Sequence, residues 1–428
     1  MGLLKKHPTI VLGLGVTLLF LILLFIHPKF IDSLDLKFYD VMMGMRGDPD
    51  PDSNIVLVEI DDDSIEKLGR WPWPRSLIAE GIRKINQGDP KLIGLNFILA
   101  EPAESRGLRV LRELETLFAE EVLEQSGTKG QMFLDVISGA RSELDDDQKL
   151  ADAFKESGRV VLPVFFKEAA VVGETAAVTD QLLMDQSIQN IRDPYDVASA
   201  SYRADEIILP IPAYFKNSKG IGHINFGYDI DGTLRRERLL YQYSGLFIPS
   251  YTLKLAALYL NLGADKTRAE LGSAVYLGSL EIPTTLRSEL LVSFKGPGGS
   301  FKRFSFFDVI NEKVPLSIFK NKLVLVGPSA AGLINPLATP VDNYMPLSEF
   351  SANAIWAILN KQFVQEPPWG AMLQFLLILI IGAVITFAMP RLKAKISGIS
   401  FVALLVLMIG GSTYFFVSKG LWVQIAYP

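Results

Sequence analysis

The amino-acid sequence predicts a mixed α/β fold: a largely parallel sheet covered by helices, plus an N-terminal transmembrane helix and a C-terminal transmembrane hairpin. The first observation is the order of elements in residues 55–99, where two aliphatic, β-branched runs flank a helical pattern. Strand, helix and strand in so short a span form a right-handed crossover, so the two strands lie parallel. The second observation is three uncharged apolar segments, at residues 9–26, 373–389 and 396–417, each long enough to cross a bilayer.

Composition narrows the possible functions. The formal net charge of -5 argues against nucleic acid as a partner, because nucleic acid needs a basic face. The chain has no cysteine, so it forms no disulfide and no thiolate metal site. Of its three histidines, His7 and His27 flank the first apolar segment and His223 stands alone. We therefore predict no catalytic residue, no metal site and no cofactor.

Residues 1–27 are predicted to be a transmembrane anchor. Lys5 and Lys6 precede the uncharged run at 9–26. Cleavage as a secretory signal is the alternative, but residues 25–29 offer no small-residue site for the peptidase and the run is longer than a typical signal core. The anchor is therefore expected to be retained.

Residues 28–368 are predicted to form the main domain. An amphipathic helix at 30–46 leaves the membrane, and an Asp–Pro run at 48–52 ends it. The strand at 55–60 stops at Asp61, Asp62 and Asp63, which can cap a short helix that ends at Gly69. The next strand is expected at 91–99, after a helix at 77–86.

Candidate ligand-binding residues follow the first strand. They are Asp61, Asp62, Trp71, Trp73 and Arg75. The alternation of Trp and Pro in residues 71–74 predicts a stiff extended segment that fixes the direction of Arg75. We expect these side chains to meet in one crevice at the strand end, where α/β proteins bind ligands. The alternative is an arginine–carboxylate pair that only holds the loop in place.

An insertion at about 101–143 carries an apolar stripe at helical spacing. One interpretation is a lid on the same core. The other is a contact between two copies of the chain, with Leu111, Leu114 and Phe118 as the first candidates, because an apolar stripe outside a closed core needs another surface to cover it.

Later segments imitate binding motifs incompletely. Asp145, Asp146 and Asp147 start a helix, where acidic residues favour the helix dipole, so a metal cluster is not predicted. Residues 222–226 and 234–243 are expected to form a hairpin around Asp231-Gly232. The alternative, a calcium-binding loop, is not predicted because the glutamate that such a loop requires is missing. The glycine-rich loop at 295–300 lacks the ending of a phosphate-binding loop.

Residues 369–428 are predicted to be C-terminal transmembrane helices. Arg391, Lys393 and Lys395 lie between the two apolar runs and, with Lys5 and Lys6, indicate the cytoplasmic side. The domain at 28–368 is then expected on the periplasmic or extracellular side of a multi-pass inner-membrane protein. Residues 421–428 restart an apolar run that stops, so we expect the last span to be truncated and the chain to be a piece of a longer protein.

Four sequence blocks in this order closely resemble the CHASE domain of type 2, an extracellular sensory domain associated with cyclases and histidine kinases. They are the strand with Asp-Asp-Asp-Ser and Leu-Gly-Arg-Trp-Pro-Trp-Pro-Arg-Ser at 55–76, Gly-His-Ile-Asn at 222–225 with Asp-Ile-Asp-Gly-Thr-Leu-Arg-Arg at 229–236, Phe-Lys-Gly-Pro-Gly-Gly at 294–299, and residues 322–355 with Ala-Asn-Ala-Ile at their end. Two positions depart from the pattern: Asn96 stands where Asp is expected, and Ser351 where His often precedes Ala-Asn.

The resemblance implies the sensory module of a bacterial transmembrane receptor, with a cyclase or kinase output on the cytoplasmic side. The chain has no nucleotide loop, kinase catalytic loop or phospho-acceptor histidine box, so it is expected not to be an enzyme as given. The expected partners are the membrane, a second copy of the chain and an unknown small-molecule or envelope ligand. The alternatives are a structural or assembly protein whose outer domain binds itself or an envelope partner, and an envelope enzyme built on the carboxylates beside Arg75.

Overall fold

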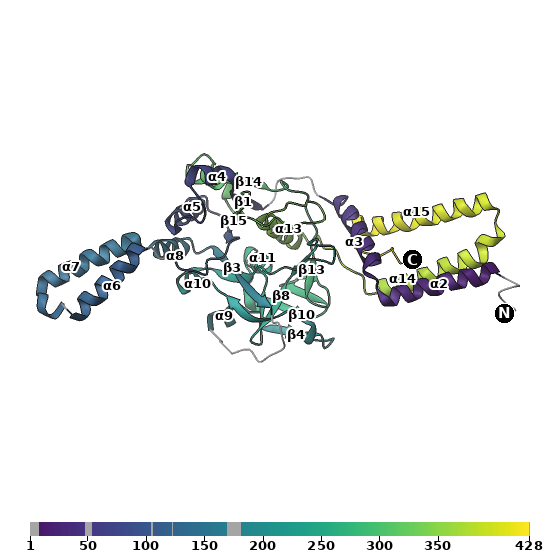
Figure 1. Cartoon of the computed structure of the whole chain (residues 1–428), viewed down its shortest axis with the longest axis horizontal. Coiled ribbons are helices and arrows are strands. Elements are labelled where there is room, and N and C mark those ends of the chain that lie inside the picture. The colour runs from purple at the N-terminus through teal and green to yellow at the C-terminus, as the bar shows by residue number, and fades with distance from the viewer. Residues whose placement is uncertain (1–7, 48–53, 104–105, 122, 169–180, 428) are drawn as a thin grey trace.

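The computed structural model describes residues 8–47, 54–103, 106–121, 123–168 and 181–427. Lys5, Lys6 and the Asp–Pro run at 48–52 lie outside these residues. The molecule is elongated, with a helical hairpin at one end, the α/β domain in the middle and long apolar helices at the other end (Figure 1).

The main sheet confirms the predicted fold class. In the described residues it has nine strands in the order β14-β1-β15-β2-β3-β5-β8-β9, and β6 also pairs with β3. Strands β14, β1, β15, β2, β3 and β6 are parallel neighbours, whereas the β3–β5 and β8–β9 pairs are antiparallel. The strands are β1 (Ile55–Ile60), β2 (Leu92–Leu95), β3 (Val160–Glu168), β5 (Arg203–Ile208), β6 (Gly220–His223), β8 (Leu240–Tyr243), β9 (Leu246–Pro249), β14 (Lys302–Ser305) and β15 (Leu323–Pro328).

Helices cover both faces of this sheet, which explains why all six residues of β1 are buried. Val56 and Val58 point to a core shared with α5 (Arg75–Gln87), α8 (Asp146–Ser157), α10 (Pro212–Asn217) and α12 (Phe306–Ile310). Ile55 and Leu57 point to the opposite core, shared with α11 (Tyr251–Tyr259) and α13 (Leu347–Leu359). The alternation follows from the period of two along a strand.

Two smaller sheets lie beside the main one. One has the order β12-β11-β10-β4 and the other pairs β13 with β7. Their strands are β4 (Asn190–Arg192), β7 (Arg236–Arg238), β10 (Thr267–Glu270), β11 (Ala274–Leu277), β12 (Leu280–Pro283) and β13 (Glu289–Leu291). Short helices α4 (Asp62–Leu68), α9 (Gln181–Gln186), η1 (Ala198–Ala200), η2 (Ala264–Lys266) and η3 (Leu316–Phe319) connect the larger elements.

The predicted hairpin at 222–243 is wrong in its pairing. The turn exists, with the Gly232 amide donating to the Asp229 carbonyl at 2.9 Å, but β6 joins β3 in parallel instead of pairing with β7 or β8. A single antiparallel bridge, between Phe226 and Glu237, links the two arms. All four residues of β6 are buried, and the main sheet satisfies their backbone groups.

The insertion forms two helices, α6 (Arg106–Glu121) and α7 (Leu123–Leu144), that pack on each other and project away from the domain (Figure 1). Phe118 meets Phe133 across the hairpin with ring centroids 4.6 Å apart. Arg141 donates to Glu115 at 2.6 Å. The hairpin is thus held together by its own contacts.

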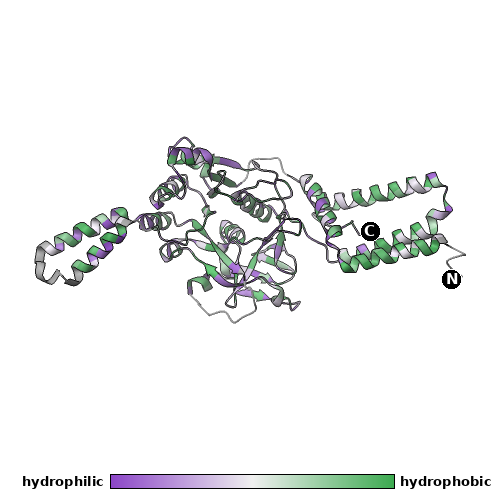
Figure 2. Cartoon of the chain, viewed as in Figure 1, coloured by the Kyte–Doolittle hydropathy of each residue, from purple (hydrophilic) through white to green (hydrophobic). Residues whose placement is uncertain are grey.

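Within the described part of the chain, three helices are long and apolar enough to span a membrane (Figure 2): α2 (Pro8–Ile26), α14 (Gly370–Ala383) with its continuation η4 (Val384–Ala388) and η5 (Met389–Arg391), and α15 (Ala394–Lys419). Helices α2 and α14 run antiparallel and pack closely. Gly13 lies against Thr386, and Gly382 lies against Thr17. Small residues at such contacts let the backbones of membrane helices approach.

Helix α3 (Lys29–Gly44) crosses the base of the domain, between the sheet and the apolar helices (Figure 1). It begins after a break at His27 and Pro28, where His27 has a φ of 48°. Its inner face joins a core of Tyr39, Met43, Phe294 and Phe416, so α3 contacts both the domain and α15.

Candidate functional site

The strand-end loop, residues 61–75, begins with two carboxylates that hold neighbouring segments. Asp61 caps α4 by accepting from the Ser64 amide at 2.9 Å, and it accepts at 2.9 Å from the hydroxyl of Ser305, the last residue of β14. Asp62 accepts from the Ala331 amide at 3.1 Å, beyond the end of β15. The predicted cap is confirmed, and the two carboxylates tie the carboxyl ends of three parallel strands together.

The two tryptophans form the floor of this loop. Trp73 is 3% exposed, and its indole N–H donates to the Gly69 carbonyl at 2.7 Å. Its ring lies 5.1 Å from Phe306, while Trp71 packs on Phe97 at 5.3 Å. A buried indole needs such a hydrogen-bond partner, so these contacts fix the path of the chain toward Arg75.

Arg75 meets a different aspartate from those the sequence placed beside it. Its Nε lies 3.8 Å from the Asp147 carboxylate, and its guanidinium donates to the Glu101 carbonyl at 3.4 Å. Asp147 also accepts from the Tyr214 hydroxyl at 2.5 Å and from the Ala103 amide at 2.8 Å. Burial, reinforced by the Asp147 hydrogen bond, raises the pKa of Tyr214. Asp147 is a residue that sequence analysis missed as a partner, although it stands in the acidic run at 145–147.

The two departures from the family pattern contact each other. The Asn96 amide donates to the Ser351 hydroxyl at 2.9 Å, and both side chains are buried at the end of β2. The Tyr251 hydroxyl reaches Asn96 at 3.5 Å. A neutral hydrogen-bonded pair therefore occupies the positions where Asp and His were expected.

The glycine-rich loop at 295–300 binds the protein's own carboxylates. The Gly298 amide donates to Asp342 at 2.8 Å and the Gly299 amide to Glu349 at 2.7 Å. The Arg303 guanidinium lies 3.8 Å from both Glu349 and Glu59. Burial raises the pKa of each of these glutamates, and the charge of Arg303 opposes that rise. The loop thus holds internal anions, which agrees with the prediction that it is not a phosphate-binding loop.

A small cavity of about 40 Å³ opens between α9, α11 and the four-stranded sheet. Lys254 is the one charged side chain among its lining residues, and burial lowers the pKa of Lys254 to about 8. A single water needs roughly 10–15 Å³ of such space, so the cavity accepts only very small molecules.

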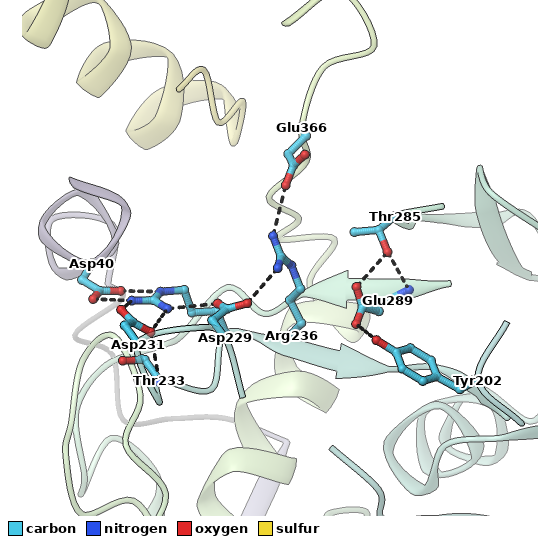
Figure 3. Close-up of polar contacts among 10 residues, drawn as sticks. Asp40, Tyr202, Asp229, Asp231, Thr233, Arg236, Thr285, Glu289 and Glu366 are labelled. Carbon is cyan, nitrogen blue, oxygen red and sulfur yellow. Dashed lines mark hydrogen bonds and ion pairs between the residues drawn. The ribbon is translucent and has the colours of Figure 1, made fainter. Parts of the chain in front are cut away.

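The strongest polar constellation lies at the base of the domain. We call it the membrane-proximal cluster; its members are Asp40, Asp229, Asp231, Arg235, Arg236 and Glu366, all of which except Arg235 are labelled in Figure 3. Arg235 is fully buried. It donates to both Asp40 oxygens, at 2.8 and 2.7 Å, to both Asp231 oxygens, at 2.9 and 2.7 Å, and to Asp229 at 3.0 Å. Three carboxylates therefore surround one guanidinium.

Arg236 extends the cluster toward the membrane helices. It donates to Asp229 at 2.8 Å and to Glu366 at 3.2 Å, four residues before α14 begins at Gly370. Burial disfavours the charged form of Arg235, but its aspartate partners hold the pKa of Arg235 above the usual value. Hydrogen bonding to Arg235 lowers the pKa of Asp231. The cluster thus joins α3, the 229–232 turn, β7 and the segment that leads to α14.

The aspartates that resemble part of a calcium loop therefore form ion pairs with arginine. Asp229 and Asp231 both pair with Arg235, and the described residues contain no group of three or more histidine, aspartate or glutamate side chains arranged to hold a metal ion. The sequence signal was available, because Arg235 and Arg236 follow the turn directly. Asp40 could not be found from sequence, since it lies 195 residues away.

A second set of contacts ties α3 and the residue Arg46 just after it to α15, to residue 363 and to the segment after α15. Arg46 donates to the Phe416 carbonyl at 2.8 Å and to the Phe363 carbonyl at 3.3 Å. Asp35 accepts from the amides of Ile425 and Ala426 at 3.0 and 2.9 Å. Residues 421–427, where a further span was expected to begin, form no helix in the structure.

An α/β domain joined at its base to apolar, membrane-length helices defines a membrane-associated protein. The model of the CHASE2 domain matches residues 16–387, most of the chain. The chain therefore belongs to the CHASE2 family, whose members are sensory domains of signalling receptors, and the resemblance seen in the sequence is confirmed. Comparison with curated proteins and with solved structures gave no match.

Proposed function

We propose that this chain is the extracytoplasmic sensory module of a bacterial transmembrane receptor that couples an outside stimulus to a cytoplasmic cyclase or kinase domain absent from the chain. The observation that carries the proposal is the membrane-proximal cluster. Through Arg235 and Arg236 it links one turn of the CHASE2 domain to α3 and to the entry of α14.

The physical reason is the cost of an unpaired buried charge. Removing a partner from a buried ion pair is strongly destabilising, so Arg235 and its aspartates must move together. A displacement of the 229–235 turn would therefore carry Asp40 and α3 with it. Such two-state shifts of packed elements are a common way to transmit a signal.

The experiment is hydrogen exchange of the full chain in lipid nanodiscs, comparing the wild type with D40N and E366Q. D40N is expected to increase amide exchange in the 229–235 turn as well as in α3, and E366Q in the turn as well as in 363–369. D63N is the matched control, because Asp63 pairs with Lys67 on the exposed surface. Increased exchange confined to the mutated segment would contradict coupling through the cluster.

We propose further that the ligand binds at the strand ends, with Asp61, Asp62, Trp71, Trp73 and Arg75 contributing to its site. The convergence of β1, β14 and β15 at this edge supports the proposal. The pairing of Arg75 with Asp147 instead favours a role in holding the loop. A ligand that raises the melting temperature of the wild type, but not of D62N, would support binding here.

The proposed location is the inner membrane, with several spans and the main domain outside. The basic residues Arg391, Lys393 and Lys395 between α14 and α15 support a cytoplasmic position for that turn. A reporter fused after Pro428 should then be outside and one placed at Lys393 inside. A reporter after Pro428 that is active only in the cytoplasm would refute this topology.

A second candidate function is assembly through the α6–α7 hairpin, with a second copy as the partner. The hairpin exposes apolar side chains at 45–69%: Val110, Leu114, Leu117, Met132, Phe133 and Val136. Leu114 stays the first candidate for the contact, Leu111 is half-buried, and Phe118 packs inside the hairpin on Phe133. A two-helix hairpin has too few neighbours to cover such a stripe.

Light scattering of the detergent-solubilised chain tests this candidate. The wild type should have a dimer mass and L114E a monomer mass. T116E adds the same charge to α6 at an exposed position and should leave the dimer intact. A monomer mass for the wild type over a wide concentration range would contradict it.

A further inference from the structure

Helix α3 has a second, outward face that the domain leaves uncovered. Its inner face buries Asp35, Leu36, Tyr39, Met42 and Met43. The opposite side exposes a stripe of large apolar side chains: Phe30 at 76%, Leu34 at 37%, Phe38 at 36%, Val41 at 59% and, just past its end, Met45 at 61%. Steps of three or four residues place all five on one line along a helix.

The position of α3 indicates what this stripe faces. The helix begins at Lys29, directly after the end of α2 at Ile26, and it crosses the ends of the apolar helices (Figure 1). Tyr39 on α3 meets Phe416 near the end of α15, with ring centroids 5.1 Å apart. Trp369, which caps α14, is 47% exposed at this end of the helix. Aromatic residues at helix ends are typical of the membrane–water interface.

The charges of α3 are arranged in agreement with this position. Asp35 accepts from the backbone at 425 and 426, Asp40 pairs with Arg235, and Asp32 accepts from the Tyr427 hydroxyl at 2.5 Å. Asp32, Asp35 and Asp40 thus each bond to another part of the chain. Lys37 stands exposed between Leu34 and Val41 in the sequence, where a flexible cation can reach lipid phosphates.

We propose that α3 is an interfacial helix whose stripe of Phe30, Leu34, Phe38, Val41 and Met45 is embedded in the outer surface of the lipid bilayer. The stripe continues the surface of α2, whose last residues Phe25 and Ile26 are 76% and 65% exposed. Most of α2 is likewise exposed, since 6% of its apolar window is buried in the protein. An amphipathic helix in this setting lies with its apolar face roughly 5–10 Å into the headgroup region.

This inference deepens the proposed sensory role and rests on it for its biological meaning. The same helix carries Asp40, which is held by the membrane-proximal cluster. One face of α3 would then contact lipid while the other contacts the sensory domain, so the state of the bilayer surface and the state of the domain would act on one element.

Spin labels give a direct test, because the chain contains no cysteine and single-cysteine variants label cleanly. L34C and V41C label the stripe, and S279C labels an exposed turn between β11 and β12 as a control. The full chain is reconstituted in nanodiscs of zwitterionic and anionic phospholipid. Accessibility of the label to oxygen, which dissolves in lipid, is compared with accessibility to a water-soluble nickel complex.

The expected ratio of oxygen to nickel accessibility is at least about three-fold higher at positions 34 and 41 than at 279, as at the depth of an interfacial helix. A ratio equal to that of S279C at both stripe positions would overturn the proposal. Spin–spin broadening at position 41 that disappears on dilution with unlabelled chain would also overturn it, by assigning the stripe to a second copy. Either result would leave the hydrogen-exchange test of coupling unaffected.

Discussion

Arg75 and Arg235 both face aspartate side chains, yet their surroundings differ. Arg75 retains 13% of its side-chain exposure and lies 3.8 Å from Asp147, at the limit of an ion pair. The side chain of Arg235 is not exposed at all, and it makes five hydrogen bonds to three aspartates. The first pair closes a loop whose shape also depends on tryptophan packing, whereas the second joins α3 to the 229–232 turn. Stronger energetic coupling between distant segments is therefore expected in the membrane-proximal cluster than in the strand-end loop.

The largest effect is expected for R235M. It leaves Asp40, Asp229 and Asp231 close together without their shared cation, and breaking a buried ion pair in this way costs about 3–5 kcal/mol of unfolding free energy. Denaturant unfolding of the full chain in detergent measures it. R192M is the matched control, because Arg192 is 65% exposed and 3.7 Å from Glu270, and should cost under about 1 kcal/mol. An equal loss of unfolding free energy in R235M and R192M would show that the buried cluster stabilises the fold no more than an exposed ion pair does.

His223 sharpens the comparison, since it is as buried as Arg235 but makes no described ion pair. Burial, followed by the charge of Arg238, lowers the pKa of His223 to about 3. The unfolded chain therefore binds a proton near pH 6.5 that the folded chain excludes, and stability is lost as the pH falls from 6.5 toward 3. At pH 5 the loss should be about 2 kcal/mol.

Melting curves at several pH values test the His223 prediction. H223F should flatten the slope of stability against pH between 6.5 and 5. An unchanged slope in H223F would show that other groups cause the acid sensitivity.

A smaller effect is expected for D61A in the strand-end loop. It removes the cap of α4 and the acceptor for Ser305, and loss of such a cap costs about 1 kcal/mol. D61N keeps an acceptor oxygen and should recover most of the loss in thermal unfolding. A cost for D61A as large as that of R235M would mean that the loop couples distant segments as strongly as the membrane-proximal cluster does.

The smallest effect is expected for R75M. Asp147 keeps its hydrogen bonds from Tyr214 and Ala103 and the contact with Arg75 is long, at 3.8 Å, so its loss should cost no more than one ordinary hydrogen bond, about 1 kcal/mol. A double-mutant cycle with D147N should give a coupling energy below about 1 kcal/mol. A coupling energy above about 2 kcal/mol would place Arg75 in the same category as Arg235.

The helices and strands whose formation depends on neighbouring residues were predicted from the sequence. Residues 55–60 form a buried strand because β-branched and aliphatic side chains suit a sheet covered on both faces, and Asp61 caps the helix that follows. The apolar runs gave the three membrane-length helices in the same way. In each case the neighbouring residues alone decide the outcome.

Contacts between distant residues were not predictable. The Asp231-Gly232 turn was found, but β6 pairs with β3, because the choice of partner depends on which strand of the main sheet is free. Asp40 with Arg235 and Arg75 with Asp147 join different elements, and a single charged residue carries no periodicity that names its partner. The parts of the candidate site that link segments were therefore visible only in the structure.

The break between α2 and α3 has a mechanical consequence. Pro28 has no amide hydrogen, and α3 restarts with Ile31 and Asp32 donating to the Pro28 carbonyl, so no continuous ladder joins the two helices. Because α2 and α3 meet at an angle at this break (Figure 1), a rotation of α3 about its own axis would move the adjoining end of α2 sideways. The close contacts of Gly13 and Thr17 with α14 hold the two helices together, so this movement would tilt α2 and α14 as one unit.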